Sequence, residues 1–393
     1  MNDVLYLAWR YIAYHRIKTG ILIASIMLII YLPVGLNVLV DQSAQQLTAR
    51  AGATPLLVGA RGSPLELALN SLYFESDTPA LTRYAEAERI GASELATPIP
   101  LYVRFRSRGQ PIVGTTLDYF EFRGLSLAEG RMMATLGEAV IGATVAQRLS
   151  LGAGDAVVSS PETVFDLAGV YPLKMKITGV LAPNFSPDDE AIFVDVKTAW
   201  IMEGLGHGHQ ELASPEASSA VLSREGNRIV ANASVVQYNE ITEENIDSFH
   251  FHGDNAEFPL SAVMAVPVDQ KSGVLLMGRY QGESDASQII EPLSVIEELL
   301  GTVVSIQQFV VAAVVIVGLA TVATAALVFM LSLRLRRREI DTMFKIGASR
   351  IHVSGTLVSE VIVVLVLAVL LAAVLTVLTS QYGTDLIENL ILS

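Results

Sequence analysis

The sequence predicts an α-helical membrane domain with three transmembrane helices and a large α+β domain outside the cytoplasm. Three long apolar segments support the membrane domain, at residues 19–40, 303–333 and 354–380. Each exceeds the roughly 18 apolar residues that suffice to cross a bilayer core. The region between the first two, residues 41–300, is instead polar, acidic and in places strand-like. A hydrophobic content of 51 % is typical of a membrane protein with a substantial soluble part.

The first element is predicted to be a helix lying along the inner membrane surface, over residues 1–18. Its aromatic residues Tyr6, Trp9 and Tyr14 stand beside the basic residues Arg10 and Arg16, and such aromatic residues are enriched at membrane interfaces. The apolar run that follows is too long for the core of a cleaved signal peptide, which is about 7–15 residues. We therefore predict that residues 19–40 form an uncleaved transmembrane helix.

The outer region, residues 41–300, is predicted to be an α+β domain. Residues 101–106 and 174–181 alternate apolar and polar side chains, as half-buried strands do. Residues 203–231 are rich in Gly, Ser and Glu and indicate an insertion or a boundary between two subdomains. Because the chain has no cysteine, this domain holds no disulfide and must be stabilised by its own core.

Charge separates the two sides of the membrane. Residues 41–300 contain 17 Lys or Arg and 34 Asp or Glu, which gives a net charge of −17 and argues against a nucleic-acid partner. Residues 334–353, between the last two apolar segments, hold six Lys or Arg. Since positive residues favour the cytoplasmic side, we predict that the N-terminus and residues 334–353 are cytoplasmic and that residues 41–300 and 381–393 are outside.

The basic segment also carries a patterned apolar face. Ile340, Met343 and Phe344 follow helical i, i+3, i+4 spacing, and Ile346 lies close by. Gly347 is suited to end this helix, and Ser349 is suited to cap the next one. An ordinary cytoplasmic loop would explain the arginines but not the apolar face.

Nucleotide and hydrolase motifs are missing from the sequence. It contains no G-x-x-x-x-G-K-[ST], and no Gly-Lys dipeptide at all, so it has no phosphate-binding loop. It contains neither G-x-S-x-G nor H-E-x-x-H. We therefore expect a chain with no catalytic residues and no cofactor of its own.

Three segments resemble the MacB/FtsX-type ABC transporter permeases. They are Arg-Arg-Arg-Glu-Ile-Asp-Thr-Met-Phe-Lys-Ile-Gly-Ala-Ser at 336–349, Glu-Ala-Val-Ile-Gly with its continuation to Asp155 at 138–155, and residues 177–195 around Asp-Asp-Glu-Ala-Ile-Phe-Val-Asp. The resemblance implies a bacterial inner-membrane protein with a large periplasmic domain. With the boundaries set by hydropathy and charge, the predicted parts are a cytoplasmic interfacial helix at 1–18, transmembrane helices at 19–40, 303–333 and 354–380, a periplasmic domain at 41–300, a cytoplasmic coupling segment at 334–353 and a periplasmic tail at 381–393.

The same resemblance implies the function. The chain would be the permease subunit of an ABC transporter, and ATP would be bound and hydrolysed by a separate ATPase subunit. The implied partners are that ATPase, a second permease copy in a dimer, a periplasmic adaptor or binding protein, and membrane lipid. The implied contacts with the ATPase lie in the coupling segment, at Glu339, Ile340, Met343, Phe344, Ile346 and Gly347.

Two alternatives to this function remain. The ATPase-driven outer domain could instead regulate a cell-envelope enzyme, or the transporter could handle a metal. The substrate and the direction of movement also stay open. The family also has a fourth transmembrane helix, whereas only three are predicted here. A truncated chain and a helix supplied by a second subunit are both open explanations.

The histidines are not explained by the resemblance. Four of the six form two pairs, His207-Gly-His209 and His250-Phe-His252. His-x-His spacing places both imidazoles on one face of a strand, and Asp254, Glu211 and Glu257 lie close in the sequence. Such ligands suit zinc or a related divalent ion, so the pairs predict either a metal site, and with it a metal-handling transporter, or surface histidines.

Overall fold

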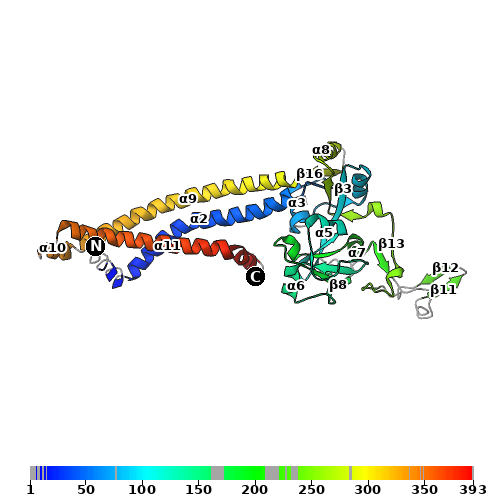
Figure 1. Cartoon of the computed structure of the whole chain (residues 1–393), viewed down its shortest axis with the longest axis horizontal. Coiled ribbons are helices and arrows are strands. Elements are labelled where there is room, and N and C mark those ends of the chain that lie inside the picture. The colour runs from blue at the N-terminus through cyan, green and yellow to red at the C-terminus, as the bar shows by residue number, and fades with distance from the viewer. Residues whose placement is uncertain are drawn as a thin grey trace. The chain divides into compact units, whose positions relative to one another are not determined.

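The computed structural model describes all residues except 1–5, 7–8, 11–12, 15, 76–77, 161–171, 209–220, 226–227, 232–237, 283–285, 336, 346, 348 and 392–393. The chain divides into two compact units. The membrane unit comprises residues 1–47 and 300–393, and the outer unit comprises residues 48–299. Figure 1 labels the elements of both units.

Three long helices form the membrane unit. They are α2 (Arg16–Gly52), α9 (Pro292–Leu335) and α11 (Arg350–Ile391), and each contains a segment long and apolar enough to cross a membrane. Many of their apolar side chains are exposed, which suits helices surrounded by lipid. Together with the large mixed sheet of the outer unit, these helices confirm the predicted fold class.

The helices extend beyond their apolar segments. Helix α2 ends at Gly52, although its apolar segment ends near residue 40. Helix α9 already begins at Pro292, and α11 continues to Ile391. Hydropathy marks the part of a helix that suits lipid, whereas polar helix-forming residues can continue the same helix in water. The predicted interfacial helix at 1–18 falls largely on residues outside the described ones.

Polar contacts join the helices within the membrane unit. The hydroxyl groups of Tyr31 and Thr379 lie 2.7 Å apart and link α2 to α11. The Gln307 side-chain amide donates to the Asn37 side chain and links α9 to α2. Hydrogen bonds of this kind are a usual source of specificity between membrane helices.

A mixed sheet of ten strands forms the outer unit. Its strand order is β16-β1-β15-β3-β4-β9-β6-β8-β5, with β7 paired to β8. The strands are β1 (Leu56–Ala60), β3 (Ala96–Ser107), β4 (Gln110–Thr115), β5 (Leu127–Gly130), β6 (Glu138–Ile141), β7 (Ala156–Val158), β8 (Lys174–Leu181), β9 (Ile192–Asp195), β15 (Ala262–Pro267) and β16 (Ser287–Ile290). Most neighbours are antiparallel, but β4 with β9 and β6 with β8 are parallel. The predicted strands at 101–106 and 174–181 lie in β3 and β8.

Short helices and small sheets complete the outer unit. The α-helices are α3 (Pro64–Tyr73), α4 (Ala85–Ala92), α5 (Leu117–Arg123), α6 (Ala143–Leu149), α7 (Val196–Met202) and α8 (Gln270–Arg279). The small sheets pair β2 (Thr82–Arg83) with β14 (Pro259–Leu260), β10 (Gly206–Gly208) with β13 (Phe249–Phe251), and β11 (Val221–Glu225) with β12 (Arg228–Ala231). Sequence signals set several helix starts. Ser63, for example, accepts a hydrogen bond from the Glu66 N–H and precedes Pro64 at the start of α3.

Trp200 of α7 lies at the centre of an aromatic group in the core. Its side chain is 1 % exposed, and its indole N–H donates to the Pro259 carbonyl at 2.9 Å. Its ring makes edge contacts with Tyr84, Phe258 and Phe251. The only other tryptophan in the sequence is Trp9, so in a Trp9→Phe background the fluorescence of Trp200 reports on the outer unit alone.

Candidate functional site

The predicted coupling segment, residues 334–353, contains a short helix, α10 (Arg337–Lys345), between the two long helices α9 and α11 (Figure 1). Ile340 and Phe344 lie on one side of α10, because residues four apart share a helix face. Ile340 is half-buried, and Phe344 is 40 % exposed. A basic helix thus carries a partly exposed aromatic side chain.

Backbone geometry ends this helix sharply. Gly347 has a φ of +97°, a conformation that favours glycine, and its N–H donates to the Phe344 carbonyl at 3.1 Å. Helix α11 begins at Arg350, and the carbonyl of Ser349 accepts from the Val353 N–H at 3.2 Å. Backbone hydrogen bonds therefore close the end of α10 and the start of α11.

The predicted coupling residues are only partly described. Ile340, Phe344 and Gly347 are described with their side chains or backbone, whereas Ile346 lies outside the described residues. The backbone of Glu339 and Met343 is helical, and their side chains are not described. A contact with an ATPase remains a prediction for all six residues.

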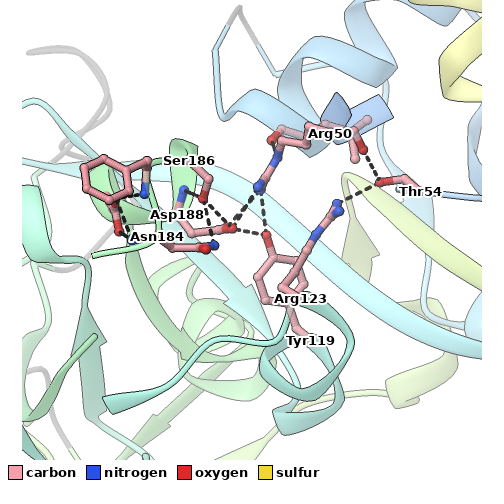
Figure 2. Close-up of polar contacts among 10 residues, drawn as sticks. Arg50, Thr54, Tyr119, Arg123, Asn184, Ser186 and Asp188 are labelled. Atoms are coloured by element: carbon pink, nitrogen blue, oxygen red, sulfur yellow. Dashed lines mark hydrogen bonds and ion pairs between the residues drawn. The ribbon is translucent and has the colours of Figure 1, made fainter. Parts of the chain in front are cut away.

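A second site lies at the C-terminal end of α2, inside the outer unit. The Arg50 guanidinium forms two hydrogen bonds to the Asp188 carboxylate, from Nη1 to Oδ2 at 2.8 Å and from Nη2 to Oδ1 at 2.9 Å. The Tyr119 hydroxyl donates to Asp188 Oδ1 at 2.6 Å and accepts from Arg50 Nη2 at 2.9 Å. We call these three residues the Arg50 cluster, and Figure 2 shows their side chains pointing toward one another.

Burial shifts the pKa values of the residues in the Arg50 cluster. The side chains of Arg50 and Asp188 are 7 % and 0 % exposed. Burial by itself would raise the pKa of Asp188, but the hydrogen bond and charge of Arg50 outweigh it and hold that pKa below its ordinary value. Burial raises the pKa of Tyr119. At neutral pH, the cluster therefore contains a carboxylate, a guanidinium and a neutral phenol.

The segment that carries Asp188 is held in place by its own hydrogen bonds. Asp188 lies in a short 3₁₀ helix, η1 (Pro187–Glu190), whose first residues are capped by Ser186. The Asp189 carboxylate accepts the backbone N–H groups of Asn184 and Phe185, at 2.7–3.0 Å. Asp188 thus reaches Arg50 from a preorganised turn (Figure 2).

Gly142 explains why two of the family-like sequence segments lie together. A Cβ atom at Gly142 would lie 2.3 Å from the carbonyl oxygens of Asp188 and Asp189, so only glycine allows this approach. The Gly142 N–H also donates to the Ala191 carbonyl at 2.9 Å. Strand β6, just before Gly142, pairs with β9, just after η1. The two segments at 138–155 and 177–195 therefore form the frame that positions Asp188.

A further contact holds the residues that follow α2. Arg123, at the end of α5, donates from Nη2 to the Thr54 hydroxyl oxygen at 2.9 Å. The Thr54 hydroxyl donates in turn to the Arg50 carbonyl at 3.0 Å. Helix α5 thus contacts the end of α2 through both Tyr119 and Arg123 (Figure 2).

Sequence reasoning missed the Arg50 cluster, although a signal was present. Arg50 is the only Lys or Arg between residue 41 and residue 60, directly after an apolar segment. Asp188 lies inside a family-like segment, but nothing in the sequence links it to a residue 138 positions earlier. Tyr119 has no distinguishing sequence context.

The third site is a histidine cluster of His207, His250 and His252. Their possible ligand atoms all lie within 4.8 Å of one another. The ring centroids of His207 and His250 are 4.9 Å apart, and each lies 4.8 Å from the centroid of His252. The structure therefore brings together three of the four predicted metal-binding residues, and His209 lies outside the described residues.

Comparison with known proteins gives two family matches. Residues 19–244, more than half of the chain, match the MacB-like periplasmic core domain. Residues 311–390 match the FtsX-like permease C-terminal domain. Among curated proteins, no sequence matches the chain.

Solved structures give more distant similarities, at low identity. The extracellular domain of the noncanonic ABC-type transporter YknZ from Gram-positive bacteria is 12 % identical, with a TM-score of 0.31, over 60 % of this chain and 98 % of that one. The periplasmic region of MacB from Actinobacillus actinomycetemcomitans is 10 % identical, with a TM-score of 0.32. The match covers 63 % of this chain and 92 % of that one. A domain of a putative permease protein from Porphyromonas gingivalis is 12 % identical, with a TM-score of 0.25. The match covers 60 % of this chain and 86 % of that one.

Proposed function

Because this chain belongs to the MacB/FtsX-type permease family, we propose that it is the membrane subunit of an ABC transporter. In this proposal, a separate ATPase subunit hydrolyses ATP, and the permease couples hydrolysis to movements of its periplasmic domain. Those movements export, extract or move a substrate. The chain acts in the bacterial inner membrane as a multi-pass protein, paired with a second permease copy.

The observation that carries this proposal is the position of α10 in the chain. The outer unit lies between the first and second membrane-length helices, and α10 lies between the second and third. If all three helices cross the membrane, α10 and the outer unit are on opposite sides of it, because successive spans alternate sides. The basic residues of α10 favour the cytoplasm for its side, where ATP is available.

The Arg50 cluster supports the coupling half of the proposal. Helix α2 is continuous from Arg16 to Gly52, so it contains both a membrane-length apolar segment and Arg50. Within the outer unit, Arg50 is bound to Tyr119 of α5 and Asp188 of η1. A displacement of the end of α2 would therefore be transmitted to the sheet through a buried ion pair instead of a loose linker.

Co-purification tests the proposed partner. The full chain would be purified from membranes of its source organism through a tag without histidine, and the recovered proteins would be identified by mass spectrometry. We expect a subunit with a phosphate-binding loop, together with ATP hydrolysis in the purified fraction. The control is another multi-pass protein with the same tag. Recovery of the chain without any ATPase above that control would contradict the proposal.

A further inference from the structure

The geometry points to a divalent-metal site formed by His207, His250 and His252 in the outer unit, and we propose zinc as its cation. This inference is independent of the transport function proposed above. The site lies on the two-stranded sheet β10–β13, and its ligands come from both strands and from the residue after β13.

The register of the sheet places the three imidazoles together. His207 lies directly opposite His250 in the antiparallel pair, and directly opposed side chains share a face of the sheet. His252 follows His250 by two residues, so it continues on the same face. The backbone N–H of His252 donates to the Leu205 carbonyl at 3.0 Å, which extends the pairing past the end of β13.

Glycine and phenylalanine fix that register. A Cβ atom at Gly206 would lie 2.7 Å from the ring of Phe251, and one at Gly208 would lie 2.5 Å from the ring of Phe249. The two glycines beside His207 therefore leave room for the two phenylalanine rings beside His250. Aromatic rings covering cross-strand glycines are a known device for setting strand register.

The same alternation separates a core face from a ligand face. Phe249 and Phe251 are partly buried against the hydrophobic core, and the Phe251 ring contacts Trp200. Alternate residues point to opposite faces of a strand, so the histidines lie on the face away from that core. His207 is half-buried and His252 is exposed, which gives an ion access from solvent.

A hydrogen bond prepares His250 as a ligand. Its Nδ1 lies 3.0 Å from the Ser248 carbonyl oxygen. A carbonyl can only accept, so in the neutral ring Nδ1 carries the proton, and Nε2 then has the lone pair that a metal needs. Metal-binding histidines commonly donate their second ring N–H to a backbone carbonyl in this way.

Three neutral imidazoles with an open fourth position are a known zinc coordination set. Tetrahedral bonds of about 2.0–2.1 Å place ligand nitrogens about 3.3 Å apart, closer than the 4.8 Å limit of the cluster. Small rotations of these side chains would close that difference. Of the described carboxylates near the cluster in sequence, Glu257 pairs with Arg83 at 2.7 Å and Asp254 caps the 3₁₀ helix η4 (Asn255–Glu257). Beside the three described histidines, water can fill the fourth position.

The proposed ion would add a cross-link between β10 and β13, because His207 and His250 come from opposite strands of this pair. The net charge of −17 on residues 41–300 favours the approach of a cation.

Zinc titration of the full chain tests the site. The chain would carry no histidine tag, would be held in lipid nanodiscs without other subunits, and would compete for Zn²⁺ with a fluorescent chelator. We expect one zinc ion per chain. The affinity for zinc should fall at least about tenfold in His207→Ala, His250→Ala and His252→Ala. Mutating a residue that only hydrogen-bonds to a metal ligand already changes metal affinity about 10–100-fold, so losing a ligand should cost at least as much. The matched control is His352→Ala, in the membrane unit, which should bind as the unchanged chain does.

A second measurement separates a lost ligand from a misfolded domain. Trp200 fluorescence, in a Trp9→Phe background, should be the same in all variants without metal, because Trp200 contacts the core side of β13. Added zinc should raise the thermal midpoint of the unchanged chain but not of the three cluster variants. Absence of stoichiometric binding, or wild-type affinity in the three folded variants, would overturn the site.

Discussion

Replacing Asp188 by Asn is expected to lower the free energy of unfolding of the outer unit by about 3–5 kcal/mol. Removing one partner of a buried ion pair leaves the other charge buried without compensation. Such a loss typically lowers the free energy of unfolding by about 3–5 kcal/mol. Here the remaining charge is Arg50, whose side chain is 7 % exposed and has Asp188 as its ion-pair partner. Thermal unfolding of the full chain in detergent, followed by Trp200 fluorescence in a Trp9→Phe background, should show a midpoint lower by roughly 10 °C.

The matched control is Asp118→Asn. Asp118 is an exposed carboxylate on α5, the helix that also carries Tyr119, and its replacement should change stability by no more than about 0.5 kcal/mol.

The pKa of Asp188 is lower in the folded chain than in the unfolded one. The pair therefore stabilises the fold fully above the unfolded pKa of about 3.9 and loses this effect as pH falls through the folded pKa. Equal midpoints for Asp188→Asn and the unchanged chain at pH 7 would remove the structural role assigned to the cluster.

Replacing Phe344 by Asp is expected to release the ATPase subunit. If Phe344 is buried in an apolar groove of that subunit, the variant places an unpaired charge there. The cost is about 3 kcal/mol, or roughly 100-fold in affinity. The measurement is the amount of ATPase that co-purifies with the tagged chain and the rate of ATP hydrolysis per permease.

Thr342→Asp is the control for that experiment. Thr342 is an exposed residue of the same helix, and its hydroxyl donates to the Arg338 carbonyl within α10 at 2.8 Å. This variant adds the same charge to the coupling segment without removing the aromatic ring, and it should keep the ATPase. Equal recovery of the ATPase with Phe344→Asp and Thr342→Asp would show that Phe344 is not the contact.

The sequence was sufficient for the fold class because its signals are local. Apolar runs identify membrane helices, and alternation identifies strands such as the one at 174–181. The same signals predict the ends of the helices less accurately. Helix α2, for example, continues to Gly52 through polar residues, which hydropathy does not distinguish from a loop.

The candidate sites also differ in whether they depend on neighbouring residues or on residues far apart in the sequence. Helix α10 and its end at Gly347 follow from neighbouring residues, as do the two histidine pairs. The meeting of His207 with His250 depends on the pairing of β10 with β13, and the Arg50–Asp188 ion pair depends on the whole sheet. Contacts between residues so far apart in sequence are set by tertiary packing, which a single sequence does not display.

We propose that ATP hydrolysis by a partner subunit moves the outer unit of this chain. Hydrogen–deuterium exchange on the complete complex in nanodiscs tests this, comparing the ADP-bound complex with the ADP–vanadate complex that forms after ATP hydrolysis. We predict that backbone exchange changes between the two states in the last turn of α2, in α5 and in η1, the three elements joined by the Arg50 cluster. Exchange that changes in the ATPase subunit but is identical throughout residues 48–299 would contradict the account.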